Sequence, residues 1–250
     1  MQGLTDYQRF ERRVAIVTGG ARGIGRAVAR ALAAEGANVV IVARSESQCH
    51  EAADEIGALA VPADVRDSSA CRRVVDAAAE RWSPPSILVN AAGISPSWVR
   101  AEDQDPSVFR EIIDTNVVGA FAMSRAAAGG LLERGGAIVN IASVLGVIGS
   151  PRLAGYGASK AALIHLTRTL AREWANRNVR VNAVCPAYVE TDMTSGLLAV
   201  DSRRETILRA TPLGRLATLE EIVAPVLFLA SDEATYITGA SLQVDGGMGT

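Results

Sequence analysis

Tyr156 and Lys160 stand four residues apart in a segment whose pattern predicts a helix. Side chains at this spacing share one helix face and can meet. A lysine cation beside a tyrosine favours the phenolate, so we expect the pKa of the Tyr156 phenol to fall from its reference value near ~10 toward neutrality. Such a phenol can serve as a general acid or base. Taken alone, the pair would also fit a half-buried aromatic residue beside a solvated lysine.

A glycine-rich segment near the start of the chain offers a second kind of chemistry. An apolar run at residues 14–17 leads into Gly19, Gly23 and Gly25, after which apolar residues recur with helical period. This order predicts a strand, a loop and a helix. Backbone N–H groups at a helix N-terminus that no side chain obstructs can bind a pyrophosphate. We interpret the segment as a dinucleotide site, although an ordinary glycine-rich turn could share this spacing.

The elements that must position these groups are visible as apolar runs that alternate with helical patterns. Such alternation predicts a parallel sheet, and near-continuous runs are typical of strands covered by helices on both faces. We expect one α/β domain over residues 1–250, doubly wound, with its ligand at the carboxyl ends of the strands. A long excursion at residues 191–212 is interpreted as a substrate lid. The seven runs lie at residues 14–17, 39–42, 59–61, 87–89, 138–141, 179–184 and 242–244.

Together these features resemble the short-chain dehydrogenases/reductases of the compact single-domain type, over nearly the whole chain. The resemblance implies a Rossmann-type parallel sheet of strand order 3-2-1-4-5-6-7, a homotetramer, and direct hydride transfer between a nicotinamide and a carbonyl or alcohol carbon. Further matches to the family are Asp64-Val65, Asn90-Ala91-Ala92-Gly93, Asn116, Ser143, Pro186 with Thr191, and Val244-Asp245-Gly246-Gly247.

By this resemblance the catalytic residues are Asn116, Ser143, Tyr156 and Lys160. In the reductive direction Tyr156 would donate its proton while Ser143 steadies the oxyanion. Lys160 would hold the nicotinamide ribose and lower the pKa of Tyr156. Asn116 would connect the lysine, through water, to solvent. Because Asn116 lies in an apolar helical stretch, its amide needs hydrogen-bond partners.

The resemblance also implies the positions that hold the cofactor. One departure lies at Ala187, where the family usually has glycine, and its methyl group leaves the fine geometry of the nicotinamide end open. The positions are Gly19, Arg22, Gly23, Ile24, Gly25, Arg44, Asp64, Val65, Asn90, Ala91, Gly93, Tyr156, Lys160, Pro186, Val189 and Thr191.

The end of the second predicted strand bears on the choice of cofactor. An acidic residue there would bind the ribose of NAD and repel a 2′-phosphate, but this chain has Ala43 followed by Arg44. Arg44 offers a planar fork of donors suited to phosphate, and Arg22 could reach the same group. We therefore predict NADP(H). NAD(H) stays open, because an arginine at this position can also follow an acid in NAD users.

The substrate is left open between two classes. Arg134 and Arg177 match positions where 3-oxoacyl reductases dock an acyl carrier protein, whereas residues 165–175 and Tyr188 look more like polyol and sugar-acid dehydrogenases. The loop at residues 94–98, with residues 145–153, Tyr188 and the lid, should line the substrate pocket. A silent dinucleotide-binding regulator would be expected to lack one of the four catalytic residues.

Composition agrees with an enzyme of this class and argues against others. The chain has 250 residues, with 25 basic and 27 acidic ones and a formal charge of −2, which argues against a nucleic-acid binder. Its three cysteines and two histidines show no familiar metal-site spacing. The polar segment at residues 1–13 lacks the apolar core of a signal peptide, and no apolar run reaches the ~18 residues of a membrane span. We expect a cytoplasmic protein with no membrane or nucleic-acid partner.

Overall fold

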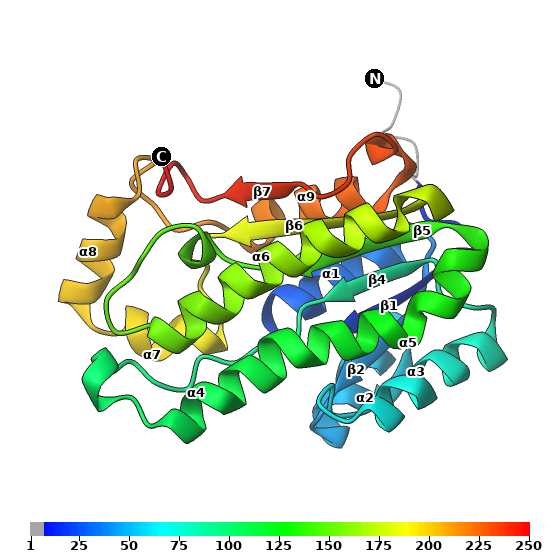
Figure 1. The fold of residues 1–250 in the computed structure, drawn as a ribbon, viewed down its shortest axis with the longest axis horizontal. Coiled ribbons are helices and arrows are strands. Elements are labelled where there is room, and N and C mark those ends of the chain that lie inside the picture. Colours follow the sequence, from blue (N-terminus) through cyan, green and yellow to red (C-terminus); the bar gives the residue numbers. More distant parts are fainter. Residues whose placement is uncertain (1–7) are drawn as a thin grey trace.

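A computed structural model describes residues 8–250, which form a seven-stranded parallel sheet of order β3-β2-β1-β4-β5-β6-β7 with helices on both faces (Figure 1). The predicted fold class and strand order are confirmed. Of the predicted polar segment at residues 1–13, residues 1–7 lie outside the described part. The strands are β1 (Val14–Thr18), β2 (Asn38–Ala43), β3 (Leu59–Pro62), β4 (Ile87–Asn90), β5 (Gly136–Ile141), β6 (Val179–Pro186) and β7 (Ser241–Val244).

The helices connect successive strands and cover the sheet. Within residues 8–250, no helix has both the length and the apolar character that a bilayer crossing requires. A five-residue π-helical turn, η2 (Asp114–Val118), joins two of the helices into one continuous rod. The α-helices are α1 (Gly23–Ala34), α2 (Glu46–Ile56), α3 (Ser68–Arg81), α4 (Pro106–Ile113), α5 (Gly119–Arg134), α6 (Ala154–Trp174), α7 (Asp192–Leu198), α8 (Asp201–Ala210) and α9 (Leu219–Ala230).

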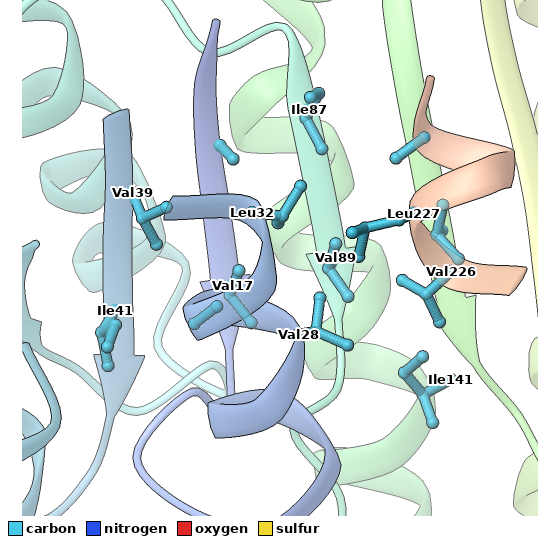
Figure 2. Close-up of a cluster of buried hydrophobic side chains, with 14 of the residues drawn as sticks. Val17, Val28, Leu32, Val39, Ile41, Ile87, Val89, Ile141, Val226 and Leu227 are labelled. Atoms are coloured by element: carbon cyan, nitrogen blue, oxygen red, sulfur yellow. The ribbon is translucent and has the colours of Figure 1, made fainter. Parts of the chain in front are cut away.

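One face of the sheet packs against α1 and α9, as Figure 2 shows. Val28 and Leu32 lie four residues apart on α1, so both project from the same side of the helix onto the strands, where neither is exposed. Val226 and Leu227 of α9 extend the same cluster. Full burial of a side chain of this size stabilises the fold by about 1.5–3 kcal/mol, so this layer holds the glycine loop firmly.

The opposite face packs against α3, α5 and α6. Its cluster includes Val74 from α3, Met123 and Leu131 from α5, and Leu170 from α6, all of them buried. Because helices cover both faces, every residue of β1 is buried, which explains why the strands read as continuous apolar runs.

The sheet reverses its winding direction between β1 and β4. Strand β1 pairs with β2 on one side and with β4 on the other, so the connections leave in opposite directions and open a crevice at the carboxyl ends. The arrowheads of β4, β6 and β7 point toward the end of the molecule where α7 and α8 lie (Figure 1). The functional groups predicted from the sequence gather at this end.

Candidate active site

A cavity of about 520 Å³ lies at the carboxyl ends of the central strands. It extends from the glycine loop to Tyr156 and Lys160, and every predicted cofactor position except Asn90 lines it. The sequence motifs, which are spread over more than 170 residues, therefore border one space. A nicotinamide dinucleotide needs such an elongated site, with an anion-binding loop near its centre.

The glycine loop fits a pyrophosphate because no side chain could stand in it. Gly19 has a left-handed backbone (φ +65°), and a Cβ there would lie 2.8 Å from the backbone nitrogen of Ala92. A Cβ on Gly25 would collide with the carbonyl oxygen of Gly19. Helix α1 begins at Gly23 without a side-chain cap from Arg22, so its first N–H groups stay available to an anionic ligand.

The end of the larger cavity away from Tyr156 and Lys160 carries two arginines. Arg22 and Arg44 line it, both are exposed, and neither forms an ion pair with a described acidic residue. Asp64 also lines this end, but its carboxylate accepts from Arg66 Nη2 at 2.6 Å, and that guanidinium lowers the pKa of Asp64. Asp64 does not cap α3, because Asp67 does so by accepting from Ser69 N.

Asn90, at the end of β4, does not line the cavity. Its side chain is buried, and its amide nitrogen donates to Asn140 Oδ1 at 2.9 Å and to Ser124 Oγ at 3.2 Å. Asn140 in turn donates to Thr167 Oγ1 at 2.8 Å. Asn90 therefore ties β4 to β5, α5 and, through Thr167, α6. Its Oδ1 has no hydrogen-bond partner among the described residues, and its role toward the cofactor stays a prediction.

Tyr156 and Lys160 lie on one face of α6, as their spacing predicted. The Lys160 ammonium nitrogen is 5.6 Å from the centroid of the Tyr156 ring. Lys160 is buried and donates to the carbonyl oxygen of Ile141 at 2.7 Å, so its head group is held at the end of β5. The helix brings the two side chains together, and the strand end fixes the amine.

The pKa of Tyr156 shifts in the direction opposite to the prediction. Burial raises it to about 12, although a hydrogen bond with Ser143 acts the other way. Burial also lowers the pKa of Lys160 to about 8. The expected fall toward neutrality is wrong for the protein by itself, because burial disfavours the phenolate and the neighbouring Tyr188 acts in the same direction.

Asn116 occupies the centre of the π-helical turn η2 and is fully buried. Its amide nitrogen donates to Ser159 Oγ at 3.0 Å and to the Ile94 carbonyl at 3.1 Å, and its oxygen accepts from Ile94 N at 2.8 Å. A Cβ on Gly93 would lie 3.3 Å from Asn116 Oδ1 and 3.5 Å from Lys160 Nζ, so the amide and the amine converge there. Such π turns are frequent at functional sites.

Ser143 lies just beyond β5, where its hydroxyl accepts from Leu145 N at 3.2 Å. A second cavity of about 260 Å³ begins at this residue. Ser143 and Tyr156 line both cavities, so they form part of the wall between them. Residues 95–98, Leu145, Leu153 and Tyr188 line the smaller cavity, whereas Ile94 lines the larger one and residues 146–152 of the predicted segment line neither.

The segment after β6 closes the larger cavity on its other side. Ala187 donates to Val244 O at 3.2 Å and lines both cavities, so its methyl group is accommodated where the family usually has glycine. Val189 forms an isolated bridge with Ala217. Thr191 caps α7 and lies beside the glycine loop, because a Cβ on Gly23 would be 3.6 Å from Thr191 Cγ2.

Comparison with known proteins assigns this arrangement to a family. The family model described as enoyl-(acyl carrier protein) reductase matches residues 19–249. The chain is 42% identical over 244 residues to 3-oxoacyl-[acyl-carrier-protein] reductase FabG of Escherichia coli (strain K12), covering 96% of this chain and 98% of that protein. The chain belongs to the short-chain dehydrogenases/reductases. It is an oxidoreductase of the type that acts on alcohols and carbonyls.

Two further relatives of this short-chain dehydrogenase/reductase have other substrates in their names. Galactitol 2-dehydrogenase (L-tagatose-forming) of Cereibacter sphaeroides is 44% identical over 251 residues, covering 97% of this chain and 98% of that protein. The crystal structure of a gluconate 5-dehydrogenase from Burkholderia cenocepacia J2315 in complex with NADP and tartrate superposes with a TM-score of 0.91 at 32% identity, covering 97% of each chain.

The predicted lid at residues 191–212 consists largely of the helices α7 and α8. Met193 and Thr194 of α7 line both cavities, and Arg203 of α8 lines the smaller one. The sequence interpretation missed these three residues. The side chains that a lid helix directs into a cavity depend on its packing angle, which local sequence spacing does not reveal. Thr191 and Thr194 did carry a sequence signal, because their spacing is typical of a helix start.

Arg134 and Arg177 lie away from both cavities. Arg134 ends α5 just before β5, and Arg177 precedes β6, so both are at the amino-terminal edge of the sheet. The hydrogen bond from Gly136 N to Asn178 O, at 3.1 Å, holds these two segments together. The length of β5 separates them from Ser143 by about 20 Å, so within one chain they do not border the site.

Proposed function

We propose that the chain is an NADP(H)-dependent oxidoreductase that interconverts a carbonyl and a secondary alcohol by direct hydride transfer. The observation that carries the proposal is the wall shared by the two cavities, which contains Tyr156 and Ser143. A substrate in the smaller cavity would present its oxygen to the phenol and the hydroxyl while its carbon faces the larger cavity. That division matches a reaction between two ligands held on either side of one proton donor.

The chain's own residues manage the proton. When bound, the nicotinamide supplies the hydride in reduction and accepts it in oxidation. Tyr156 stays protonated at neutral pH because burial raises its pKa, so it donates to the substrate oxygen as negative charge develops there. Ser143 hydrogen-bonds to the same oxygen. Lys160 and Asn116 converge beside Gly93. They would connect Tyr156, through water, to solvent, from which the phenol regains its proton after each reduction.

The preference for NADP(H) rests on the far end of the larger cavity. Arg22 and Arg44 offer unpaired guanidinium groups, and β2 ends in Ala43 where a carboxylate would repel a 2′-phosphate. The structural relative from Burkholderia cenocepacia, in complex with NADP, supports the same choice. Asp64 lines the same cavity, and its carboxylate forms an ion pair with Arg66, while the charge of Arg44 acts on it more weakly.

Equilibrium binding of NADPH and NADH tests the cofactor preference. We expect NADPH to bind at least about tenfold more tightly, and Arg44→Asp to remove that advantage, because a lost phosphate contact and a new repulsion act together. Arg172→Asp, on the exposed side of α6, is the matched control and should change neither affinity. Equal or tighter NADH binding by the unaltered protein contradicts the NADP(H) assignment.

A second candidate is an NAD-dependent polyol or sugar-acid dehydrogenase on the same scaffold. The 44% identity to galactitol 2-dehydrogenase favours it, while the 42% identity to FabG keeps acyl carrier protein thioesters in the comparison. A screen of keto-acyl thioesters, sugars and simple ketones with both cofactors separates these classes. Uniform lack of turnover would favour a catalytically silent regulator. Homotetramer formation and a cytoplasmic location are proposed with this function, and sedimentation of the purified protein tests the first.

A further inference from the structure

The smaller cavity contains an unusual combination of groups. Arg203, on α8, is the one charged residue among the described residues that line it, and no carboxylate is present in that wall. The other polar groups are uncharged, including the side chains of Ser95, Ser97 and Tyr188. The cavity therefore has a positive electrostatic potential at its lid side and neutral donors and acceptors elsewhere.

Arg203 is stacked but not neutralised. Its guanidinium carbon lies 4.7 Å from the centroid of the Trp98 ring. It forms no ion pair and no side-chain hydrogen bond with any described residue. Arg215, outside this cavity, shows the contrast, because its guanidinium grips Glu221 with two hydrogen bonds of 2.8 and 2.6 Å. Stacking on an indole leaves the N–H edge of a guanidinium open to a planar acceptor.

Trp98 contributes the face of its ring to this edge of the cavity. Its indole Nε1 is enclosed by protein and has no hydrogen-bond acceptor among the described residues. Because that nitrogen has almost no accessible surface, a ligand in the cavity does not reach it. Arg203 is therefore the cationic donor that this edge offers to an anion.

The size of the cavity limits what Arg203 can bind. Its volume of about 260 Å³ lies below the range of ~300–1,000 Å³ common for drug-sized ligands. Tyr156 and Ser143 occupy the wall nearest the cofactor, and Arg203 reaches the cavity from the lid. A small molecule with its reacting oxygen at one end and an anionic group at the other would use both walls.

We propose that Arg203, stacked on Trp98, is a specificity-determining residue that binds the carboxylate of a small hydroxy acid or its oxo acid. The cation fixes the acid's charged end under the lid and directs its hydroxyl or carbonyl group toward Tyr156. The redox step rests on the function proposed above, whereas binding of the acid does not. A polyol of the same length lacks the carboxylate and gains nothing from Arg203.

Calorimetric titration tests the inference without relying on turnover. The full-length protein, saturated with whichever nicotinamide dinucleotide binds more tightly, is titrated with gluconate and threonate and with their uncharged counterparts glucitol and threitol. We expect at least one acid to bind tenfold or more tightly than its polyol. Arg203→Met should weaken binding of that acid at least tenfold and change polyol binding less than twofold. Arg203→Lys should show an intermediate loss, because it keeps the charge but not the planar fork.

Arg204→Met is the matched control, since Arg203 and Arg204 are adjacent exposed arginines on α8 and only Arg203 lines the cavity. It should bind the acid as the unaltered protein does. The inference is overturned if neither acid binds better than its polyol, or if Arg203→Met weakens acid and polyol equally, which would mean a packing role through Trp98. Acid binding that follows the expectation, with no turnover of any acid, thioester, sugar or ketone, would overturn the proposed function and leave this inference standing.

Discussion

The two cavities that share Tyr156 are built from different parts of the chain. The larger one is bordered mainly by strand ends and by glycines such as Gly19 and Gly25 that have no room for a side chain, and the start of α7 closes one side of it. The smaller one is bordered by side chains from the loop at residues 95–98 and from the lid helices α7 and α8. Packing against the sheet holds the first in place, whereas the second depends on connecting segments.

This difference explains how relatives can share a fold and differ in substrate. The FabG of Escherichia coli and the galactitol 2-dehydrogenase of Cereibacter sphaeroides resemble this chain at 42% and 44% identity, yet their names give unlike substrates. Function on a common scaffold is set by the groups placed at its site, and loops accept change more readily than packed strands do. The following experiments test whether the two cavities respond to substitution as differently as their construction suggests.

The largest effect is expected at Tyr156, one of the residues that line both cavities. Tyr156→Phe removes the proposed proton donor and should lower kcat by about 10²-fold to 10⁴-fold, while nucleotide affinity stays unchanged. Steady-state kinetics with fluorescence titration of the cofactor measures both. Tyr188→Phe, in the wall of the smaller cavity, is the control and should retain most of kcat. Equal losses of kcat in the two variants would contradict the assignment of Tyr156 as the proton donor.

At the rigid end, Gly25→Ala should damage both stability and cofactor binding. Its Cβ would collide with the carbonyl oxygen of Gly19, so the loop must shift, at a cost of about 3 kcal/mol in the free energy of unfolding. Dinucleotide affinity should fall at least tenfold with it. The control Gly129→Ala meets nothing within 4 Å and should stabilise α5 by about 0.5–1 kcal/mol. Chemical denaturation of both variants measures the two changes in the free energy of unfolding.

Lys160→Met should change how stability depends on pH. Burial lowers the pKa of Lys160 from 10.5 to about 8, so between these values the unfolded chain binds more protons and the stability of the unaltered protein rises with pH. The variant lacks this dependence, so its stability relative to the unaltered protein should fall by about 2 kcal/mol between pH 7 and pH 10. Urea denaturation across this range measures the difference, and a constant difference would mean that the amine is not desolvated.

The smallest change in stability is expected at the adjustable end. Met193 of α7 lines both cavities and the residue is 47% exposed, so Met193→Ala should leave the free energy of unfolding within about 0.5 kcal/mol. Its KM for the substrate should change a few-fold, because the lid wall recedes. Thermal unfolding with Michaelis–Menten kinetics checks both. A large loss of stability would mean that the lid belongs to the rigid part of the molecule.

The fold could be predicted almost completely because its signals are local. Each apolar run lies within a strand, and β5 exceeds the predicted run at 138–141 by only two residues, Gly136 and Ala137. Strands buried on both faces have to be apolar throughout, so each residue of such a run indicates the strand without knowledge of distant contacts. The order of the strands came from the resemblance to the family.

The site was predictable only in part, because several of its properties depend on contacts distant in sequence. The approach of Lys160 to Tyr156 follows from helical spacing, but the raised pKa of the phenol follows from burial and, in the same direction, from Tyr188, which lies 32 residues further along the chain. The Asn90 side chain points into the protein, where it donates hydrogen bonds to Asn140 of β5 and Ser124 of α5, which are distant in sequence. The stacking of Arg203 on Trp98 joins segments a hundred residues apart, which no single motif encodes.

The π-helical turn at Asp114–Val118 amounts to one residue more than an ordinary helix would hold in that place. Deleting one residue from it would let α4 and α5 run on as a regular helix, and the flanking side chains would keep their directions because the widened turn already absorbs the extra residue. The residues of the turn itself would be displaced, so Asn116 would no longer be held against both Ile94 and Ser159. A shortened variant selected for heat resistance alone would lose the arrangement for which we propose a catalytic role, so screens of deletion variants in this segment need a catalytic readout.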